Sequence, residues 1–133
     1  MKRVDIYFLL LATVLLVCGA TLGIVMGAQE NFQLTPVHAH LNLAGWASLA
    51  LFGLTYRAYP ALAATRLARF HFIVSGTASV LLPIGIGLAV LKAEPGLAIF
   101  AAILWLLGVL MFLAQLVRLL GAVDEAPALA PAE

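Results

Sequence analysis

Two histidines and an asparagine at alternate positions are the residues of this sequence best suited to chemistry. His38, His40 and Asn42 lie in the otherwise apolar run 36–46. Pro36 suits the first turn of a helix, which places both histidines about one turn into that helix. Imidazole is a common ligand for iron, copper and zinc. We therefore take metal ligation as the chemistry to test, against the alternative of solvated histidines or histidines bonded to loop carbonyls.

The two imidazoles are expected to point in nearly opposite directions. Residues two apart on a helix lie roughly 200° apart around its axis. His38 and His40 therefore cannot readily hold one small ion, but they could serve two sites, or one could serve a site and the other packing. Asn42 follows one turn below His38 on the same face. Gly45, a further turn down, could let a neighbouring helix or a flat ligand approach closely.

The elements that must position these residues are apolar helices. Hydrophobic residues make up 65% of the 133 residues and charged residues 10%, against roughly 45–50% and about 25% in soluble domains. Four uncharged apolar runs are each long enough to cross a hydrocarbon core of about 30 Å as a helix. We predict an all-α fold, a four-transmembrane-helix antiparallel bundle forming one domain (1–121), and a disordered cytoplasmic tail (122–133). The runs cover 6–28, 37–56, 70–91 and 96–117.

The first run could also be a signal peptide, because Lys2 and Arg3 precede it. A signal core has only about 7–15 apolar residues, so we expect a retained helix. Basic residues elsewhere follow the second and fourth runs, which places both termini in the cytoplasm. The net charge of +1 gives no excess of positive charge of the kind that indicates nucleic-acid binding. The lipid bilayer is therefore the expected partner.

His71 is a second candidate metal ligand. It lies near the start of the third run, between Phe70 and Phe72, and hence near the inner membrane surface. From the rise per residue, we expect His71 and His40 to lie about 20 Å apart along the membrane normal. The two should therefore not ligate one iron in a single protomer. The alternative is a histidine in the aromatic belt at the membrane interface.

Three glycines spaced by four, Gly19, Gly23 and Gly27, give the first run a smooth face. Such faces allow close contact between helices. The sequence leaves open whether that contact lies within one chain or between chains.

His38-Ala39-His40 followed by Gly45-Trp46 resembles a haem-ligand helix of haem-copper (cbb-type) cytochrome c oxidase subunit I. In that branch a basic loop then leads to a helix that begins with an aromatic-flanked histidine, and residues 66–72 look like that element. The resemblance covers residues 36–85. It implies that His38 would ligate a high-spin haem and His40 a low-spin haem.

The resemblance also implies a haem b pocket and suggests its lining. Asn42, Gly45 and Trp46 would lie beside the cofactor, and Lys92 is a basic residue on the same outer side. The chain departs from subunit I because it lacks the other low-spin haem ligand, the copper histidines and the associated tyrosine. It should therefore not reduce oxygen by itself, and whether it is an enzyme stays open.

Three functions remain. The leading hypothesis is a b-type haem protein of the bacterial inner membrane for electron transfer or for gas or haem binding. A bis-histidine site would then require a homo-oligomer. The second is a copper or zinc site built at an oligomer axis from repeated His38 or His40. The third is a cofactor-free accessory or assembly subunit of a respiratory complex.

Overall fold

The computed structural model describes the backbone of residues 3–124 and the side chains of residues 3–121. Of the described residues, 89% are helical and none lies in a strand. The all-α class predicted from composition is therefore confirmed. Of the tail predicted over residues 122–133, residues 122–124 are helical, and the rest lies outside the described residues.

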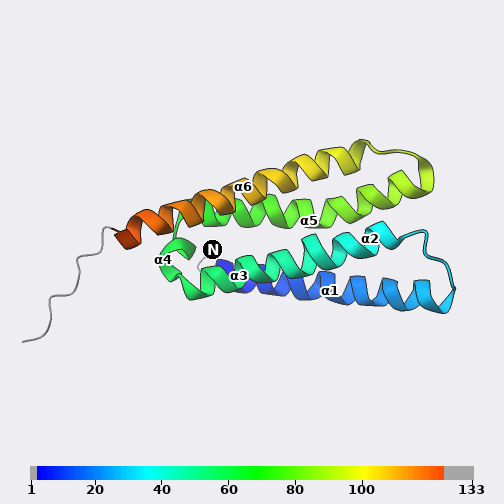
Figure 1. The fold of residues 1–133 in the computed structure, drawn as a ribbon, viewed down its shortest axis with the longest axis horizontal. Helices are drawn as coiled ribbons and strands as arrows, with labels where there is room; N and C mark the ends of the chain where they lie inside the picture. The colour runs from blue at the N-terminus through cyan, green and yellow to red at the C-terminus, as the bar shows by residue number, and fades with distance from the viewer. Residues whose placement is uncertain (1–2, 125–133) are drawn as a thin grey trace, which may run out of the picture.

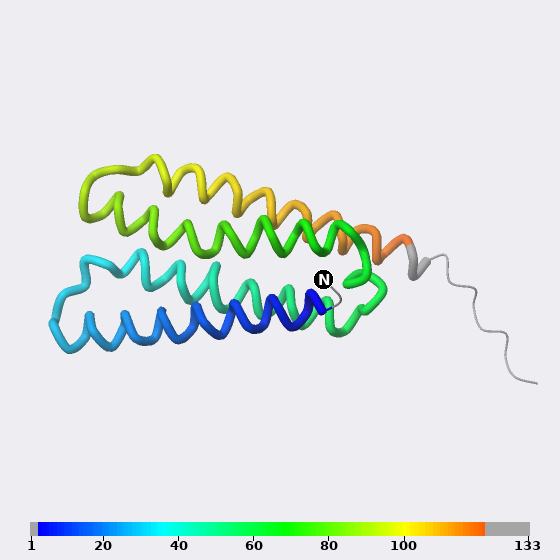
Figure 2. The backbone as a smooth tube through the Cα atoms, turned by 180° about the vertical axis from the view of Figure 1, so that it is seen from behind, coloured from blue at the N-terminus to red at the C-terminus, as the bar shows by residue number. Residues whose placement is uncertain are grey.

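The described chain forms two antiparallel helical hairpins that lie side by side (Figures 1 and 2). In the first hairpin, α1 packs against a returning helix built from α2, a π-helical segment η1, and α3. A short helix, α4, connects it to the second hairpin, which consists of α5 and α6. The bounds are α1 Val4–Ala28, α2 Thr35–His40, η1 Leu41–Ser48, α3 Leu49–Ala58, α4 Pro60–Ala63, α5 Arg66–Lys92 and α6 Gly96–Asp124.

Three helices, α1, α5 and α6, are each long and apolar enough to cross a membrane. Their most apolar windows have mean hydropathies of 2.6, 2.0 and 2.7. The run 37–56, predicted as one span, instead comprises three consecutive helical segments that are each shorter than a span. By length and composition, α1, α5 and α6 each qualify as a membrane span. No single segment of the returning helix does.

The third span begins earlier than predicted because a threonine caps it. The Thr65 hydroxyl accepts a hydrogen bond from the Ala68 amide at 3.1 Å, which is the usual way of satisfying a free amide in the first turn. The helix therefore begins at Arg66 rather than at residue 70. The fourth helix also extends past the predicted end at 117, to Asp124.

Aromatic rings connect the two hairpins at the end of the molecule where α4 lies. Phe8 of α1, Phe52 of α3 and Phe112 of α6 surround His71 of α5, with ring centroids 5.0, 4.7 and 5.6 Å from the His71 ring. Tyr56 completes this group, which we call the aromatic cluster. The aromatic cluster thus joins α1 and α3 of the first hairpin to α5 and α6 of the second.

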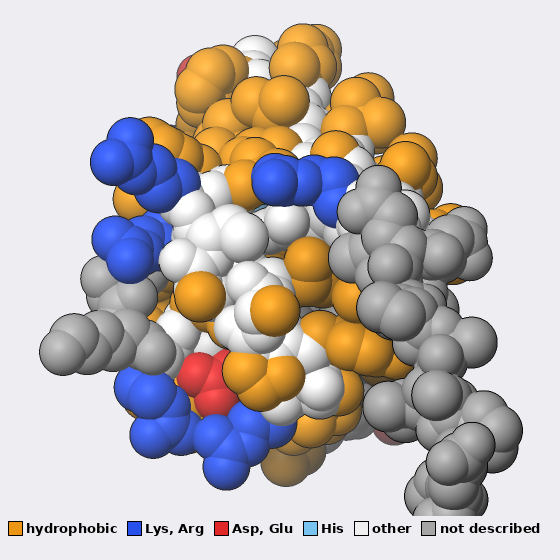
Figure 3. Space-filling view, turned by 90° about the vertical axis from the view of Figure 1, so that its left-hand side faces the viewer, with side chains coloured by type: hydrophobic (Ala, Val, Ile, Leu, Met, Phe, Trp, Pro, Cys, Tyr) orange, Lys and Arg blue, Asp and Glu red, His pale blue; other side chains and the backbone are white. Residues whose placement is uncertain are grey.

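The end at which α4 lies also carries most of the basic side chains. Figure 3 views this end and shows Lys and Arg side chains around its rim. We call it the arginine end, and its members are Arg3, Arg57, Arg66, Arg69 and Arg118. The opposite end carries Lys92 as its one basic side chain among the described residues.

Candidate functional site

The histidine motif is followed directly by a π-helical segment. His38 and His40 end α2, and Asn42 lies in η1. Short π-helical segments inside α-helices are rare and frequently occur at functional sites. The Asn42 side-chain amide donates to the His38 carbonyl oxygen at 2.8 Å. The wider turn also means that α-helical spacing does not give the direction of side chains beyond Leu41.

Gly45 and Trp46 both take part in packing. A Cβ at Gly45 would lie 3.0 Å from Cβ of Leu15 on α1. Of the two partners suggested for this glycine, the structure therefore shows the neighbouring helix. Trp46 is half-buried and packs against the core between α1 and α3.

His38 is directed at α1. Its Nδ1 atom lies 2.9 Å from the Gly19 carbonyl oxygen. A Cβ at Gly23 would lie only 2.8 Å from Cε1 of His38, and one at Gly19 only 2.6 Å from Nδ2 of Asn42. Gly19 and Gly23, which we call the glycine notch, therefore make room for α2 and η1 of the same chain. Gly27 differs, because a Cβ there would meet nothing within 4 Å.

His40 bonds to its own helix instead. Its Nδ1 atom lies 2.8 Å from the Pro36 carbonyl oxygen, and the ring is half-buried. A carbonyl oxygen only accepts hydrogen bonds, so in both His38 and His40 the Nδ1 atom must carry the proton. The Nε2 atoms then hold the free lone pair, and neither has a hydrogen-bond partner among the described residues.

His71 lies in the core and not in an aromatic belt at the membrane interface. Its exposed fraction is 0%, whereas the neighbouring Phe70 is 60% exposed. The Nδ1 atom of His71 lies 2.8 Å from the Tyr56 hydroxyl, and its buried Nε2 atom has no partner. The belt alternative was therefore wrong, because four other rings, one of them with the bonded hydroxyl, enclose this position from distant parts of the chain.

A buried polar group adjoins His71, and sequence reasoning missed it. The side-chain amide of Gln115 donates to the Thr65 hydroxyl at 3.1 Å and to the Tyr56 hydroxyl at 3.4 Å. Ser75, one turn after His71, is also fully buried and has no partner for its hydroxyl. The sequence did offer one sign of this buried group, since Gln115 is the one hydrophilic residue of the apolar run 96–117.

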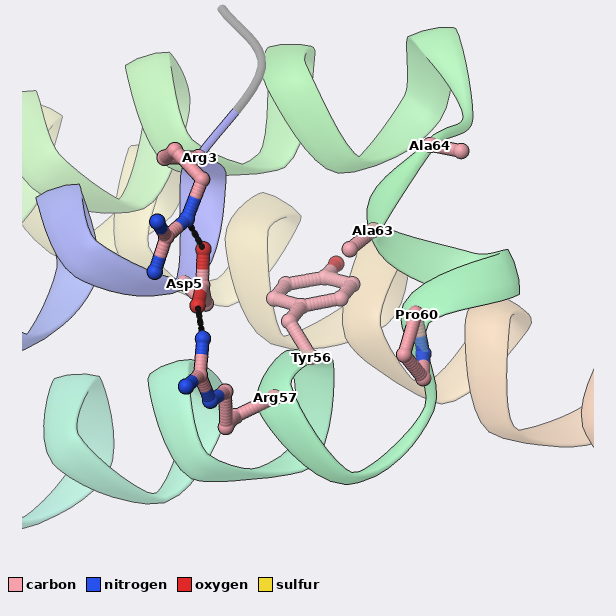
Figure 4. Close-up of a pocket in the computed structure, with 7 residues that line it drawn as sticks. All are labelled: Arg3, Asp5, Tyr56, Arg57, Pro60, Ala63 and Ala64. Atoms are coloured by element: carbon pink, nitrogen blue, oxygen red, sulfur yellow. Dashed lines mark hydrogen bonds and ion pairs between the residues drawn. The ribbon is translucent and has the colours of Figure 1, made fainter.

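A pocket of about 330 Å³ opens at the arginine end (Figure 4). The Asp5 carboxylate lies between two guanidinium groups, 3.5 Å from Nε of Arg3 and 3.2 Å from Nη1 of Arg57. The Tyr56 ring faces this pocket beside Pro60. Arg57, one of the basic residues that follow the second apolar run, thus joins α3 to α1.

The three histidines do not meet. His38 and His40 lie on α2, which sits at the opposite end of the molecule from α4 and the start of α5, where His71 is found (Figure 1). Lys92 ends α5 at the α2 end and is exposed. Within the described part of the chain, no three His, Cys, Asp or Glu side chains are grouped to hold a metal ion.

Comparison with known proteins found no matching family model, no matching curated protein and no matching solved structure. None of these comparisons links the chain to oxidase subunit I.

Proposed function

We propose that this chain is a four-span protein of the bacterial inner membrane, with both termini in the cytoplasm. The returning helix supports the fourth span, since α2, η1 and α3 follow one another without a break from Thr35 to Ala58. At about 1.5 Å per residue, this length reaches across a hydrocarbon core of about 30 Å. The basic side chains gathered at the arginine end support the orientation.

We further propose that the protein binds a b-type haem through His40. The observation that carries this proposal is the fixed ring of His40, whose Nδ1 bonds to the Pro36 carbonyl and leaves Nε2 free. Histidine ligands in proteins nearly always donate their other ring N–H to such a partner, which orients the ring. Apolar side chains of the helices would enclose the porphyrin.

The sparse ligand set favours haem over a bare metal ion. A zinc or copper site needs three or four protein ligands, and the described residues contain no such group. A porphyrin supplies four nitrogens of its own, so a single imidazole is enough to hold its iron. Copper or zinc would require His40 from several copies of the chain around an axis.

His38 is better suited to positioning than to ligation. Its ring rests in the glycine notch and bonds to Gly19 of α1. It thereby holds α2, the helix that carries His40, against α1. This assignment differs from the one that the resemblance to subunit I implies, where both histidines are ligands.

One imidazole from each protomer leaves the haem either five-coordinate or shared between two copies of the chain. The first arrangement would bind a gas such as NO or O₂, and the second would serve electron transfer. No copper-ligand set accompanies His40 among the described residues, so we do not assign oxygen reduction to this chain alone.

The test is the absorbance spectrum of the protein purified from cells supplied with haem. We expect a Soret band that His40→Ala abolishes and that His71→Phe retains. His38→Ala should weaken the band without abolishing it. A colourless, haem-free wild-type protein would contradict the proposal.

The contact between His38 and Gly19 also supports a second candidate, a cofactor-free accessory or assembly subunit of a respiratory complex. That contact accounts for His38 without any ligand. In this case the wild type would contain neither haem nor stoichiometric metal, and His40→Ala would still co-purify with the larger complex.

A further inference from the structure

One face of α5 carries two arginines followed by a line of small and apolar side chains. Residues three or four apart lie on the same side of a helix. Starting from the arginine end, this spacing selects Arg66, Arg69, Ile73, Gly76, Thr77 and Val80. The face begins at the arginine end and continues toward the middle of the helix.

Two hollows follow this face in series. The first has a volume of about 300 Å³ and is lined by Arg66, Arg69, Phe70 and Ile73. The second has a volume of about 470 Å³ and also includes Ile73 in its lining. The two hollows therefore adjoin each other at Ile73 along α5, and together we call them the α5 groove. The second hollow is lined by Leu11, Phe72, Ile73, Gly76, Thr77, Val80 and Leu81.

The groove exists because small residues lie where α5 faces α1. Gly76 has no side chain, and a Cβ there would lie 3.2 Å from Leu11 of α1. Thr77 is short and exposed. The rims are apolar, since Phe70 is 60% and Ile73 55% exposed. An apolar chain would therefore fill the groove with favourable contacts on both walls.

The arginines at the mouth are not neutralised by other described residues. Arg66 and Arg69 are exposed, and neither forms an ion pair within the described part of the chain. Asp5, an acid at this end, is already paired with Arg3 and Arg57. Guanidinium groups bind phosphate through two parallel hydrogen bonds, so the mouth suits a phosphate group.

The length of the groove matches one lipid chain. Leu81 lies twelve positions after Arg69 on α5, which at about 1.5 Å per residue is roughly 18 Å. One leaflet of a hydrocarbon core is about 15 Å thick, half of the total. The groove therefore spans one leaflet, with its charged mouth at the headgroup level.

We propose that the α5 groove binds one anionic phospholipid, with its phosphate on Arg66 and Arg69 and one acyl chain along α5 as far as Leu81. The net positive charge of the mouth favours an anionic headgroup over a zwitterionic one. This site is independent of His40, so it does not depend on haem binding.

The test is native mass spectrometry of the purified full chain, with phosphatidylglycerol and phosphatidylethanolamine added in equal amounts. We expect one phosphatidylglycerol per protomer in preference to phosphatidylethanolamine. The double variant Arg66→Gln/Arg69→Gln should lower this occupancy by roughly fivefold or more. Thr77→Phe should lower the occupancy of both lipids because its ring fills the groove.

Arg118→Gln is the matched control, because Arg118 is exposed at the same end but does not line the groove. It should bind phosphatidylglycerol as the wild type does, and so should His40→Ala. Equal loss in Arg118→Gln and in the double variant would overturn the proposal, because general surface charge would then explain binding. Wild-type protein that showed no headgroup preference, or retained an isoprenoid phosphate instead, would also overturn it.

Discussion

At the scale of single residues, the packing of each ring separates the three histidines. All three bond through Nδ1 and leave Nε2 without a partner among the described residues, the usual state of a histidine ready to bind iron. The His71 ring is enclosed by aromatic rings and the His38 ring rests in the glycine notch, whereas the half-buried His40 ring bonds only to its own helix. His40 is therefore the residue on which the proposed haem site depends.

Tyr56→Phe should destabilise the fold by roughly 1–3 kcal/mol, the usual effect of leaving a buried polar atom without a partner. The change removes the hydroxyl that bonds to Nδ1 of His71, whose Nε2 atom already lacks a partner. Thermal unfolding in detergent measures the effect. Tyr59→Phe is the control, because Tyr59 is 46% exposed. Equal stability of the two variants would show that this hydrogen bond contributes nothing.

At the scale of elements, the first hairpin depends on how closely α1 approaches α2 and η1. The glycine notch receives side chains of His38 and Asn42. Gly45 in turn allows Leu15 to approach η1. Glycine faces in membrane helices commonly permit such close contact, and here both partners belong to one chain.

Gly23→Ala should destabilise the hairpin by roughly 1–3 kcal/mol, because its Cβ would overlap the His38 ring and must displace it. Gly27→Ala is the matched control, since nothing lies within 4 Å of its Cβ. Alanine favours a helix over glycine by about 1 kcal/mol, so the control should be neutral or stabilising. Chemical unfolding in detergent compares the stabilities of the two variants. A stabilising Gly23→Ala would contradict the inference that Gly23 makes room for the His38 ring.

At the scale of the whole molecule, buried side chains connect the two hairpins. The aromatic cluster and Gln115 connect them at the arginine end. Much of the outer surface is apolar, and the window of α6 that is most apolar is only 11% buried. Lipid is the environment that such a surface requires.

The proposed four-span topology predicts that the loops before and after the returning helix lie on opposite sides of the membrane. In a Cys18→Ser background, Glu30→Cys should react with an impermeant thiol reagent in intact cells. Ala64→Cys should react only after the membrane is permeabilised. Labelling of both cysteines from the same side would show that α2, η1 and α3 do not cross.

The sequence alone determined the helical class and the approximate helix lengths. These depend on the length of each apolar run and on local caps, and both are properties of neighbouring residues. Even so, the cap at Thr65 and the π-helical segment were not anticipated, because α-helical spacing was assumed throughout. The spacing of His38 and His40 predicted that they point apart, and their different partners agree with this.

Only the tertiary structure decided which polar residues are buried together. His71 meets Tyr56 of another helix, and Tyr56 meets Gln115, 59 positions further along the chain. No local pattern reports such contacts, because they depend on how two hairpins pack. The same holds for the α5 groove, whose walls come from two helices that are distant in sequence and adjacent only in the folded chain.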